Sequence, residues 1–300
     1  MWTAIALWAL NGAIAAGYAY VASRHVEAGS PVWPWIVGAP LVYLAIVLAL
    51  TTVYFAIAWM HRTPRPAELH LDARRALRLF RREFLAIAGS VPRMMTYRAV
   101  GRDPPKAPAS DPVLLLHGVL CNAGVWRSMK RRLSAAGIAP IYAPSYGPPL
   151  ASIETFAGQV AAKIDEILAA TGASQVSIVA HSMGGLVARA YLRKFGGAKV
   201  RRVITIGTPH AGSVHAWMFP GVSLAQLRPG NPWLAELPAP TAESSPPFVS
   251  LWSWHDSMVA PQVSARLENG RNVALSGVGH NALLTDPEVA KRVIEELKRG

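Results

Sequence analysis

Residues 176–185, Val-Ser-Ile-Val-Ala-His-Ser-Met-Gly-Gly, constrain the fold of this chain more than any other stretch. A largely β-branched apolar run ends abruptly at Ser182, and a helical pattern follows. A turn this tight between strand and helix strains its central residue, so the positions two before and two after it must be small. They are Ala180 and Gly184, in the pattern A-x-S-x-G. The stretch predicts a nucleophilic Ser182; the alternative is a strand followed by a helix that the serine merely caps.

This stretch lies within an alternation of strands and helices that is typical of a parallel sheet. Apolar runs predict strands at Val113–Leu116, 139–143, 176–180, Val200–Ile206, 248–252 and 272–275. Helical patterns lie at 126–136, 153–168 and 186–195, and a closing helix is expected at Pro287–Lys298, capped by Asp286. We therefore expect residues 111–300 to form an α/β domain with a central, mostly parallel sheet flanked by helices.

Two long apolar runs precede this domain, at residues 2–23 and 32–60. Each is longer than the ~18–20 residues that cross the hydrocarbon core of a bilayer, and Trp and Tyr gather toward their ends. Only 16% of the residues are charged, against about 25% in an average soluble domain. We expect residues 1–61 to form a hairpin of two transmembrane helices. A cleaved signal peptide is the alternative for the first run, but no basic segment precedes it and it is longer than a signal sequence requires.

The orientation of the hairpin follows from its flanking charges. Arg62, Arg65 and several further arginines come directly after the second run, whereas the link between the runs contains only Arg24. Because Lys and Arg accumulate on the cytoplasmic side, we expect residues 61 onward in the cytoplasm, with the N-terminus on the same side. The single cysteine, Cys121, fits a reducing compartment. The sequence therefore predicts an integral protein of a bacterial inner (plasma) membrane with a cytoplasmic domain.

Residues 62–110 form a basic juxtamembrane segment. Residues 61–106 hold 11 Arg and Lys against 4 Asp and Glu, in a chain of net charge +13. Such local basicity indicates a membrane surface rather than nucleic acid. Apolar residues recur at three- and four-residue steps over 67–88, which predicts an amphipathic helix that either lies on anionic lipid or packs on the domain. Turn-forming residues at 101–112 predict a linker.

A serine nucleophile also needs donors for the oxyanion that forms on its substrate. Gly118 follows the first predicted strand and permits a sharp turn that directs the next backbone N–H toward the serine. We therefore expect the N–H groups of Val119 and Met183 to form an oxyanion hole, with the Met183 N–H also at a helix N-terminus. His117 is expected only to fix this loop.

Such a strand–turn–helix resembles the nucleophile turn of α/β-hydrolases, and this resemblance implies a base and an acid beyond the serine, in the order Ser, acid, His. His280 fits the base, because it follows the last predicted strand in a Gly-rich loop. Asp256 is the favoured acid, because it follows the preceding strand; Glu268 is its rival. The sequence therefore predicts Ser182, Asp256 and His280 as catalytic residues.

Five motifs in this order resemble the bacterial triacylglycerol lipase/esterase-like branch of the α/β-hydrolase superfamily. They are P-V-L-L-L-H-G at 112–118, V-A-H-S-M-G-G at 179–185, I-G-T-P-H-A-G-S at 206–213, D-x-x-V-x-P at 256–261 and G-V-G-H-N-A-L-L at 277–284. The A-x-S-x-G form is similar to that of some bacillus-type lipases. The resemblance implies a Ser182–Asp256–His280 triad and ester hydrolysis, and it does not extend to the two apolar runs.

Residues 212–247 have no sheet periodicity but contain many large apolar residues. They are too long for an ordinary connection and lie where enzymes of this family insert a cap, so we expect a cap or lid over an apolar acyl pocket. No ligand cluster indicates a metal or a cofactor. Cys121 is expected to be buried, because no separate His and Asp set supports it as a nucleophile.

These features together predict a membrane-anchored serine hydrolase that cleaves hydrophobic or lipid carboxylic esters through an acyl-enzyme. Its expected partners are such an ester and the bilayer, not nucleic acid. Two alternatives stay open: an acyltransferase or thioesterase that uses the same triad, and a non-catalytic membrane-tethered scaffold.

Overall fold

A single parallel sheet forms the centre of the molecule. The computed structural model describes residues 2–237, 246–268 and 270–299. Six strands pair in the order β2-β1-β3-β4-β5-β6, and every pair is parallel. The strands are β1 Val113–Leu116, β2 Ile141–Tyr142, β3 Val176–His181, β4 Val200–Ile206, β5 Phe248–Ser253 and β6 Arg271–Leu275. The expected mostly parallel sheet is therefore confirmed, with β2 shorter than residues 139–143.

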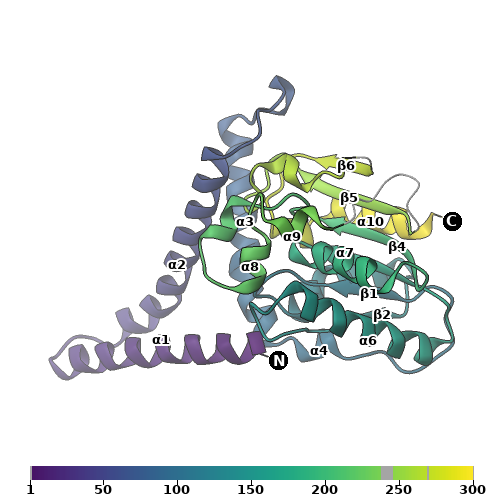
Figure 1. Cartoon of the computed structure of the whole chain (residues 1–300). Coiled ribbons are helices and arrows are strands. Elements are labelled where there is room, and N and C mark those ends of the chain that lie inside the picture. Colours follow the sequence, from purple (N-terminus) through teal and green to yellow (C-terminus); the bar gives the residue numbers. More distant parts are fainter. Residues whose placement is uncertain (1, 238–245, 269, 300) are drawn as a thin grey trace.

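Helices cover both faces of this sheet (Figure 1). Alternate side chains of β1 point to opposite faces, as the pleat requires: Leu114 packs with α6 (Ile153–Thr171) and α7 (Met183–Phe195). Leu115 packs on the other side with α5 (Arg127–Ala135) and α10 (Pro287–Lys298). Both faces of the sheet are buried, which explains why its strands are nearly continuous apolar runs.

The strand order places a crevice at the carboxyl end of the sheet. The chain runs from β1 outward to β2 and then returns to β3 on the other side of β1, so the order reverses between β1 and β3. Open α/β sheets bind ligands at such a reversal. The loops that follow β1 and β3 carry Val119 and Ser182, so both of these predicted site residues start from this point.

Several local expectations can be compared with the structure directly. Asp286 caps α10 as predicted, accepting hydrogen bonds from the N–H groups of Glu288 (2.7 Å) and Val289 (3.2 Å). The helix after the elbow begins at Met183, three residues earlier than predicted, because Ser182 itself makes the turn. A 3-10 turn, η2 (Ala123–Trp126), precedes α5. The predicted cap contains η3 (Val214–Trp217), α8 (Val222–Gln226) and α9 (Pro232–Ala235), and its residues 238–245 lie outside the described residues.

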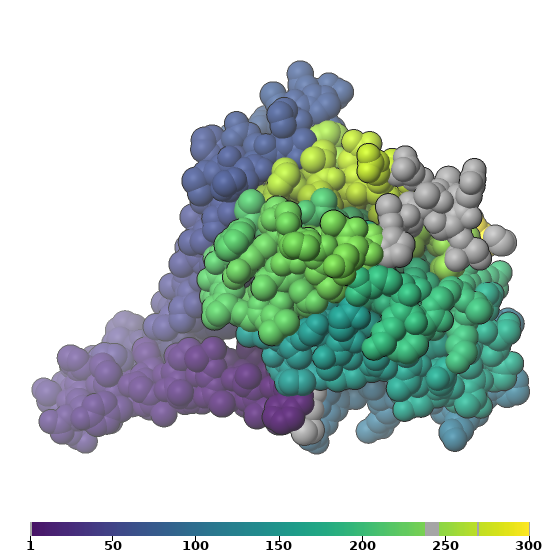
Figure 2. Space-filling view, viewed as in Figure 1, coloured from purple at the N-terminus to yellow at the C-terminus, as the bar shows by residue number. Residues whose placement is uncertain are grey.

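The two apolar runs form long helices, α1 (Trp2–Glu27) and α2 (Trp33–Met60). By length and composition each can cross a membrane, and both are largely exposed. The helices meet at their far ends, away from the domain (Figure 1). In Figure 2 the cap, in green, lies against α2 on the side from which the two helices project. The arrangement fits a hairpin in which the first residues of α1 and the last residues of α2 both lie at the domain.

The juxtamembrane segment folds into η1 (Ala67–Leu69), α3 (Ala73–Met95) and the short α4 (Arg98–Gly101). The helix predicted over 67–88 is thus α3, which begins later and extends to Met95. It packs between α2 and the domain, with buried residues that include Leu79 and Ile87. Of the two interpretations left open, packing on the domain is therefore present, while the arginine-bearing side of α3 stays exposed.

Polar contacts fix α2 to both α3 and the domain. The Tyr43 hydroxyl donates to the Ala88 carbonyl oxygen at 2.6 Å. At the other end of α2, the Thr63 N–H donates to Gln262 Oε1 at 2.9 Å. The candidate membrane helix is therefore one wall of the folded molecule and not a separate tether.

Candidate active site

Ser182 occupies a strained turn between β3 and α7. Its φ of 56° and ψ of −130° lie outside the regions that a residue with a side chain readily adopts. A Cβ at position 184 would collide with the carbonyl oxygen of Leu116, so only glycine fits there. The sharp turn predicted from A-x-S-x-G is therefore present, and it lifts the Ser182 hydroxyl out of the sheet into a pocket.

His280 and Asp256 meet beside this turn. Nδ1 of His280 lies 3.0 Å from Oδ2 of Asp256, and both side chains are buried. The other carboxylate oxygen accepts hydrogen bonds from the N–H groups of Met258 and Val259, both at 2.8 Å. These bonds fix the carboxylate, so that it holds the imidazole by Nδ1 and leaves Nε2 for a reacting group. Glu268, the rival acid, is exposed.

The charge environment of His280 favours its protonated form. Burial alone would lower the pKa of this histidine, but the charge and hydrogen bond of Asp256, together with the charge of Glu83, raise the pKa above its usual value. His280 and Ser182 line the same pocket. A base with a raised pKa accepts a proton more strongly, and it is lost to protonation as the pH falls through that pKa.

Two further histidines support this arrangement. Nε2 of His181 lies 3.1 Å from the backbone carbonyl oxygen of His280, and burial lowers the pKa of His181 well below its usual value. The His181 ring also packs against the His280 ring, with ring centroids 4.6 Å apart. His117 is stacked on Tyr146, and burial lowers its pKa to about 4. Its Nδ1 lies 2.9 Å from the Gly118 carbonyl oxygen, so it holds the loop as predicted.

The loop after β1 approaches Ser182 closely. A Cβ at position 118 would lie 2.9 Å from Cβ of Ser182, so a glycine is required there. Val119 lines the pocket and Met183 is the first residue of α7. Within the described part of the chain, the backbone N–H of neither residue donates a hydrogen bond to a protein acceptor. Both N–H groups are therefore free to donate to a bound group, and their role as an oxyanion hole stays a prediction.

Glu83 of α3 is a supporting residue that the sequence analysis did not identify. Its side chain is fully buried. Oε1 accepts hydrogen bonds from the Ser257 hydroxyl (2.7 Å) and from the backbone and side-chain N–H groups of Asn281 (2.9 Å each). Oε2 accepts from the Ala282 N–H (2.9 Å), and the Ser257 hydroxyl oxygen accepts from the His280 N–H (3.3 Å). One carboxylate thus holds the loop on both sides of His280.

A sequence signal for Glu83 does exist. Glu83 stands four residues after Leu79 and four before Ile87, so it lies on the apolar face of an amphipathic helix. A carboxylate on such a face must find hydrogen-bond donors inside the protein. The position therefore indicates a buried acceptor, although the sequence does not show which donors it meets.

The pocket above Ser182 is apolar and has a volume of about 210 Å³. Cap residues form one side, namely Met218, Phe219, Leu224 and Leu227. The helices α2 and α3 form another part of the wall, with Tyr54, Ile87, Ser90 and Met94. Tyr54 belongs to α2 and the other three to α3, so one of the two apolar helices contributes to the pocket itself.

Cys121 also lines this pocket and is half-buried, close to the burial expected. Burial raises the pKa of its thiol to about 12. The thiolate is the reactive form of cysteine, so this residue is a poor nucleophile at neutral pH. Among the residues that the structure describes, no group of three His, Cys, Asp or Glu side chains forms a metal site.

Comparison with known proteins identifies a fold that agrees with the parallel sheet and with the strand–helix turn at Ser182. The family model of the alpha/beta hydrolase fold matches residues 111–236. The globular part of this chain has the α/β-hydrolase fold. The chain is 33% identical over 117 residues to proteins named triacylglycerol lipase from Pseudarthrobacter phenanthrenivorans and Burkholderia plantarii. The match covers 35% of this chain and 35% and 31% of theirs, so the chain spans about a third of the length of these relatives.

Solved structures share the fold at low sequence identity. Aspergillus fumigatus lipase B has a TM-score of 0.59 at 21% identity, covering 68% of this chain and 57% of that one. The mature form of Bacillus licheniformis lipase BlEst2 has a TM-score of 0.54 at 20% identity, covering 65% of this chain and 95% of that one. These matches establish the fold of the α/β-hydrolase domain.

Proposed function

We propose that this protein is a serine hydrolase that cleaves carboxylic esters through Ser182, His280 and Asp256. One observation carries the proposal: a strained serine at the strand–helix turn shares a pocket with a histidine whose Nδ1 is bound to a buried aspartate. An imidazole held in this way can activate a hydroxyl that shares its pocket. The triacylglycerol lipase names of the two sequence relatives support the same reaction class.

The reaction begins when Nε2 of His280 takes the proton of the Ser182 hydroxyl as its oxygen attacks the ester carbonyl carbon. The carbonyl oxygen becomes an oxyanion, which the N–H groups of Val119 and Met183 bind. The intermediate collapses, His280 returns the proton to the leaving alkoxide, and an alcohol departs from the acyl-enzyme. Water then attacks the acyl carbon with His280 as base, which releases the acid and restores Ser182.

The pocket and its rim favour a hydrophobic or lipid ester. Apolar side chains line the pocket, and large apolar residues stay exposed around it, with Trp217 62%, Val222 56% and Phe219 45% exposed. Exposed apolar groups of this size mark surfaces that contact other molecules or lipid. They lie on the cap, which contacts α2. We therefore place the substrate in the leaflet beside α2.

Under this proposal α1 and α2 form a membrane hairpin and the domain faces the cytoplasm. Two apolar helices of sufficient length and the arginines that follow α2 support it. A reporter fused after Gly300 tests the orientation. A cytoplasmic reporter is expected to be active and an exported one inactive; the reverse pattern would contradict the proposed topology.

The activity is tested with the full chain purified in detergent and a panel of p-nitrophenyl esters from acetate to palmitate. Hydrolysis is expected, with medium or long acyl chains preferred over acetate. Product analysis in the presence of a competing alcohol or thiol distinguishes hydrolysis from acyl transfer. Free acid as the main product supports the proposal, whereas acyl alcohol or acyl thiol as the main product would make the chain an acyltransferase.

A larger side chain on α3 should fill part of the pocket and change the preference of the enzyme for acyl-chain length. Ser90 lies in the pocket wall, and its hydroxyl donates only to the Ile87 carbonyl oxygen within the helix. Replacing Ser90 by phenylalanine is expected to reduce kcat/KM for decanoate by about tenfold or more, because a methylene lost from an apolar site costs about 1–3 kcal/mol. Acetate turnover should change little. An unchanged chain-length profile would show that the acyl chain does not lie against α3.

A further inference from the structure

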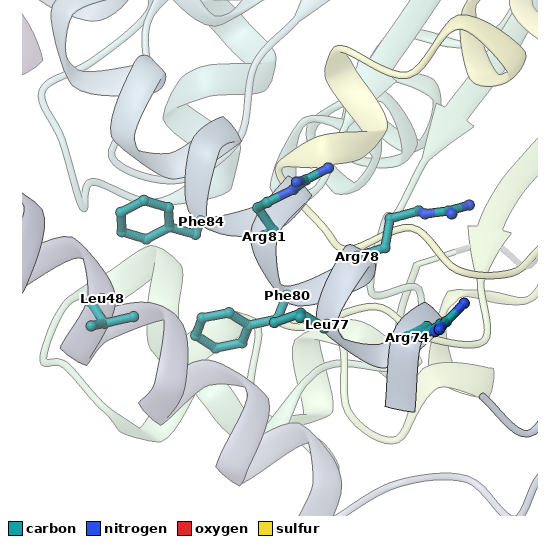
Figure 3. A pocket seen from close by; sticks show the side chains of 7 residues that line it. All are labelled: Leu48, Arg74, Leu77, Arg78, Phe80, Arg81 and Phe84. Carbon is teal, nitrogen blue, oxygen red and sulfur yellow. The ribbon is translucent and has the colours of Figure 1, made fainter. Parts of the chain in front are cut away.

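The exposed side of α3 carries two neighbouring stripes, each at the three- and four-residue spacing that keeps side chains on one helix face. The arginine stripe consists of Arg74, Arg78 and Arg81. The apolar stripe consists of Leu77, Phe80 and Phe84. Together with Leu48 of α2 they line a groove with a volume of about 430 Å³ (Figure 3). The two phenylalanines point toward Leu48 and the arginines point away from it, so the groove has an apolar wall and a cationic wall.

The charge of the arginine stripe is uncompensated. The neighbouring arginines have partners: Arg82 pairs with Asp286, and Arg75 lies 3.6 Å from Asp72. In the described part of the chain, no side chain of the arginine stripe has a hydrogen bond or an ion pair. Like charges one helical turn apart destabilise a helix. An anion bound across the stripe would remove this repulsion.

The position of the groove along α2 indicates what kind of anion it binds. Phe80 packs against Phe55, with ring centroids 5.7 Å apart, and Ala88 binds Tyr43, so α3 runs antiparallel to α2. The arginine stripe therefore lies toward the carboxyl end of α2, where arginines flank the apolar run. Leu48 lies twelve residues before the end of α2, which is about 18 Å along a helix. This is about half the thickness of a bilayer. The cationic wall thus lies at headgroup depth and the apolar wall extends to acyl-chain depth.

We propose that the groove between α2 and α3 binds one anionic phospholipid. The arginine stripe binds its phosphate, and the apolar stripe and Leu48 contact an acyl chain. A nucleic acid or an acidic peptide would match the charge but would leave the apolar wall uncovered. The site lies outside the Ser182 pocket, shares none of its lining residues, and goes beyond the proposed catalytic function. It shares with that proposal only the placement of α2 in a bilayer.

Native mass spectrometry of the full chain in detergent tests this site. The chain carries Ser182→Ala, so that no lipid is consumed, and is titrated with dioleoylphosphatidylglycerol or dioleoylphosphatidylcholine. One phosphatidylglycerol is expected to bind at least about tenfold more tightly than phosphatidylcholine, because each arginine near an anionic lipid contributes about 1 kcal/mol. The triple variant Arg74→Gln, Arg78→Gln, Arg81→Gln should remove this preference. The matched control Arg98→Gln, Arg102→Gln, Arg131→Gln removes the same charge from other exposed positions and should keep it.

A second variant tests the apolar wall. Leu77 is 68% exposed, so Leu77→Gln leaves the core intact. It should weaken phosphatidylglycerol binding several-fold, and glycerophosphoglycerol, the headgroup without chains, should not displace the lipid at equal concentration. Equal binding of both lipids, equal losses in the two triple variants, or displacement by the headgroup alone would overturn the proposal. Ester hydrolysis by the unsubstituted chain is measured separately, so failure of the lipid site is distinguishable from failure of the catalytic proposal.

Discussion

Replacing Ser182 by alanine is expected to reduce kcat for p-nitrophenyl ester hydrolysis by about 10⁴-fold or more, with the fold intact. In the proposed mechanism the Ser182 Oγ forms the acyl-enzyme; the alanine removes this atom, while the pocket and the His280–Asp256 pair stay in place. The residual rate would come from the N–H groups of Val119 and Met183 and from substrate binding. Steady-state kinetics with the full chain in detergent, together with a thermal melt, measure both parts of the expectation.

Two control variants test whether the loss of activity is specific to Ser182. Ser134 is exposed on α5, so Ser134→Ala is expected to retain full activity. Cys121→Ala should also retain most activity, because the thiol of this residue has a pKa of about 12. Loss of activity in Cys121→Ala with retention in Ser182→Ala would assign the nucleophile to the cysteine and contradict the account.

Replacing Glu83 by glutamine is expected to lower kcat by about 10–100-fold, because small displacements of a catalytic group have effects of that size. Every group that Glu83 contacts in this loop is a donor. The amide N–H of glutamine would face at least one of them, which leaves a buried donor unpaired and loosens the loop that holds His280. KM should change little, because Glu83 does not line the pocket.

The pH profile separates this role from a purely structural one. The negative charge of Glu83 helps to raise the pKa of His280, so removing that charge lowers this pKa. His280 then stays neutral to lower pH, and the acidic limb of kcat/KM should shift to lower pH in Glu83→Gln. Glu83→Asp keeps the charge and should keep the limb in place, even if kcat falls. Exposed Glu68→Gln is the control. If Glu83→Gln lowers kcat but leaves the acidic limb of kcat/KM in place, the claim that the Glu83 charge raises the pKa of His280 is contradicted.

Much of the domain could be predicted from the sequence, because its signals are local. The strand–turn–helix around Ser182 requires small residues at fixed positions, and each strand buried on both faces is a short apolar run. The order of the loops then placed Asp256 and His280 at the same edge of the sheet. The structure brings these two side chains into contact, and the exposed Glu268 stays apart from them.

The residues that hold the catalytic side chains in place and complete the pocket could not be predicted, because their contacts join distant parts of the chain. Glu83 binds Ser257 and Ala282, which lie 174 and 199 residues away. Tyr54 lines the same pocket from α2, for which the sequence predicts only a transmembrane helix. His181 likewise contacts the backbone of His280, which lies 99 residues away. No spacing in the sequence encodes such pairings.

The central claim is that Ser182 is a nucleophile activated by His280. Labelling with a fluorophosphonate, which reacts covalently with activated serines, tests it most directly, followed by peptide mass spectrometry of the full chain. The account predicts one modified residue, Ser182, with labelling abolished in Ser182→Ala and strongly slowed in His280→Ala. Labelling at another residue, or equal labelling of Ser182 with and without His280, would contradict it.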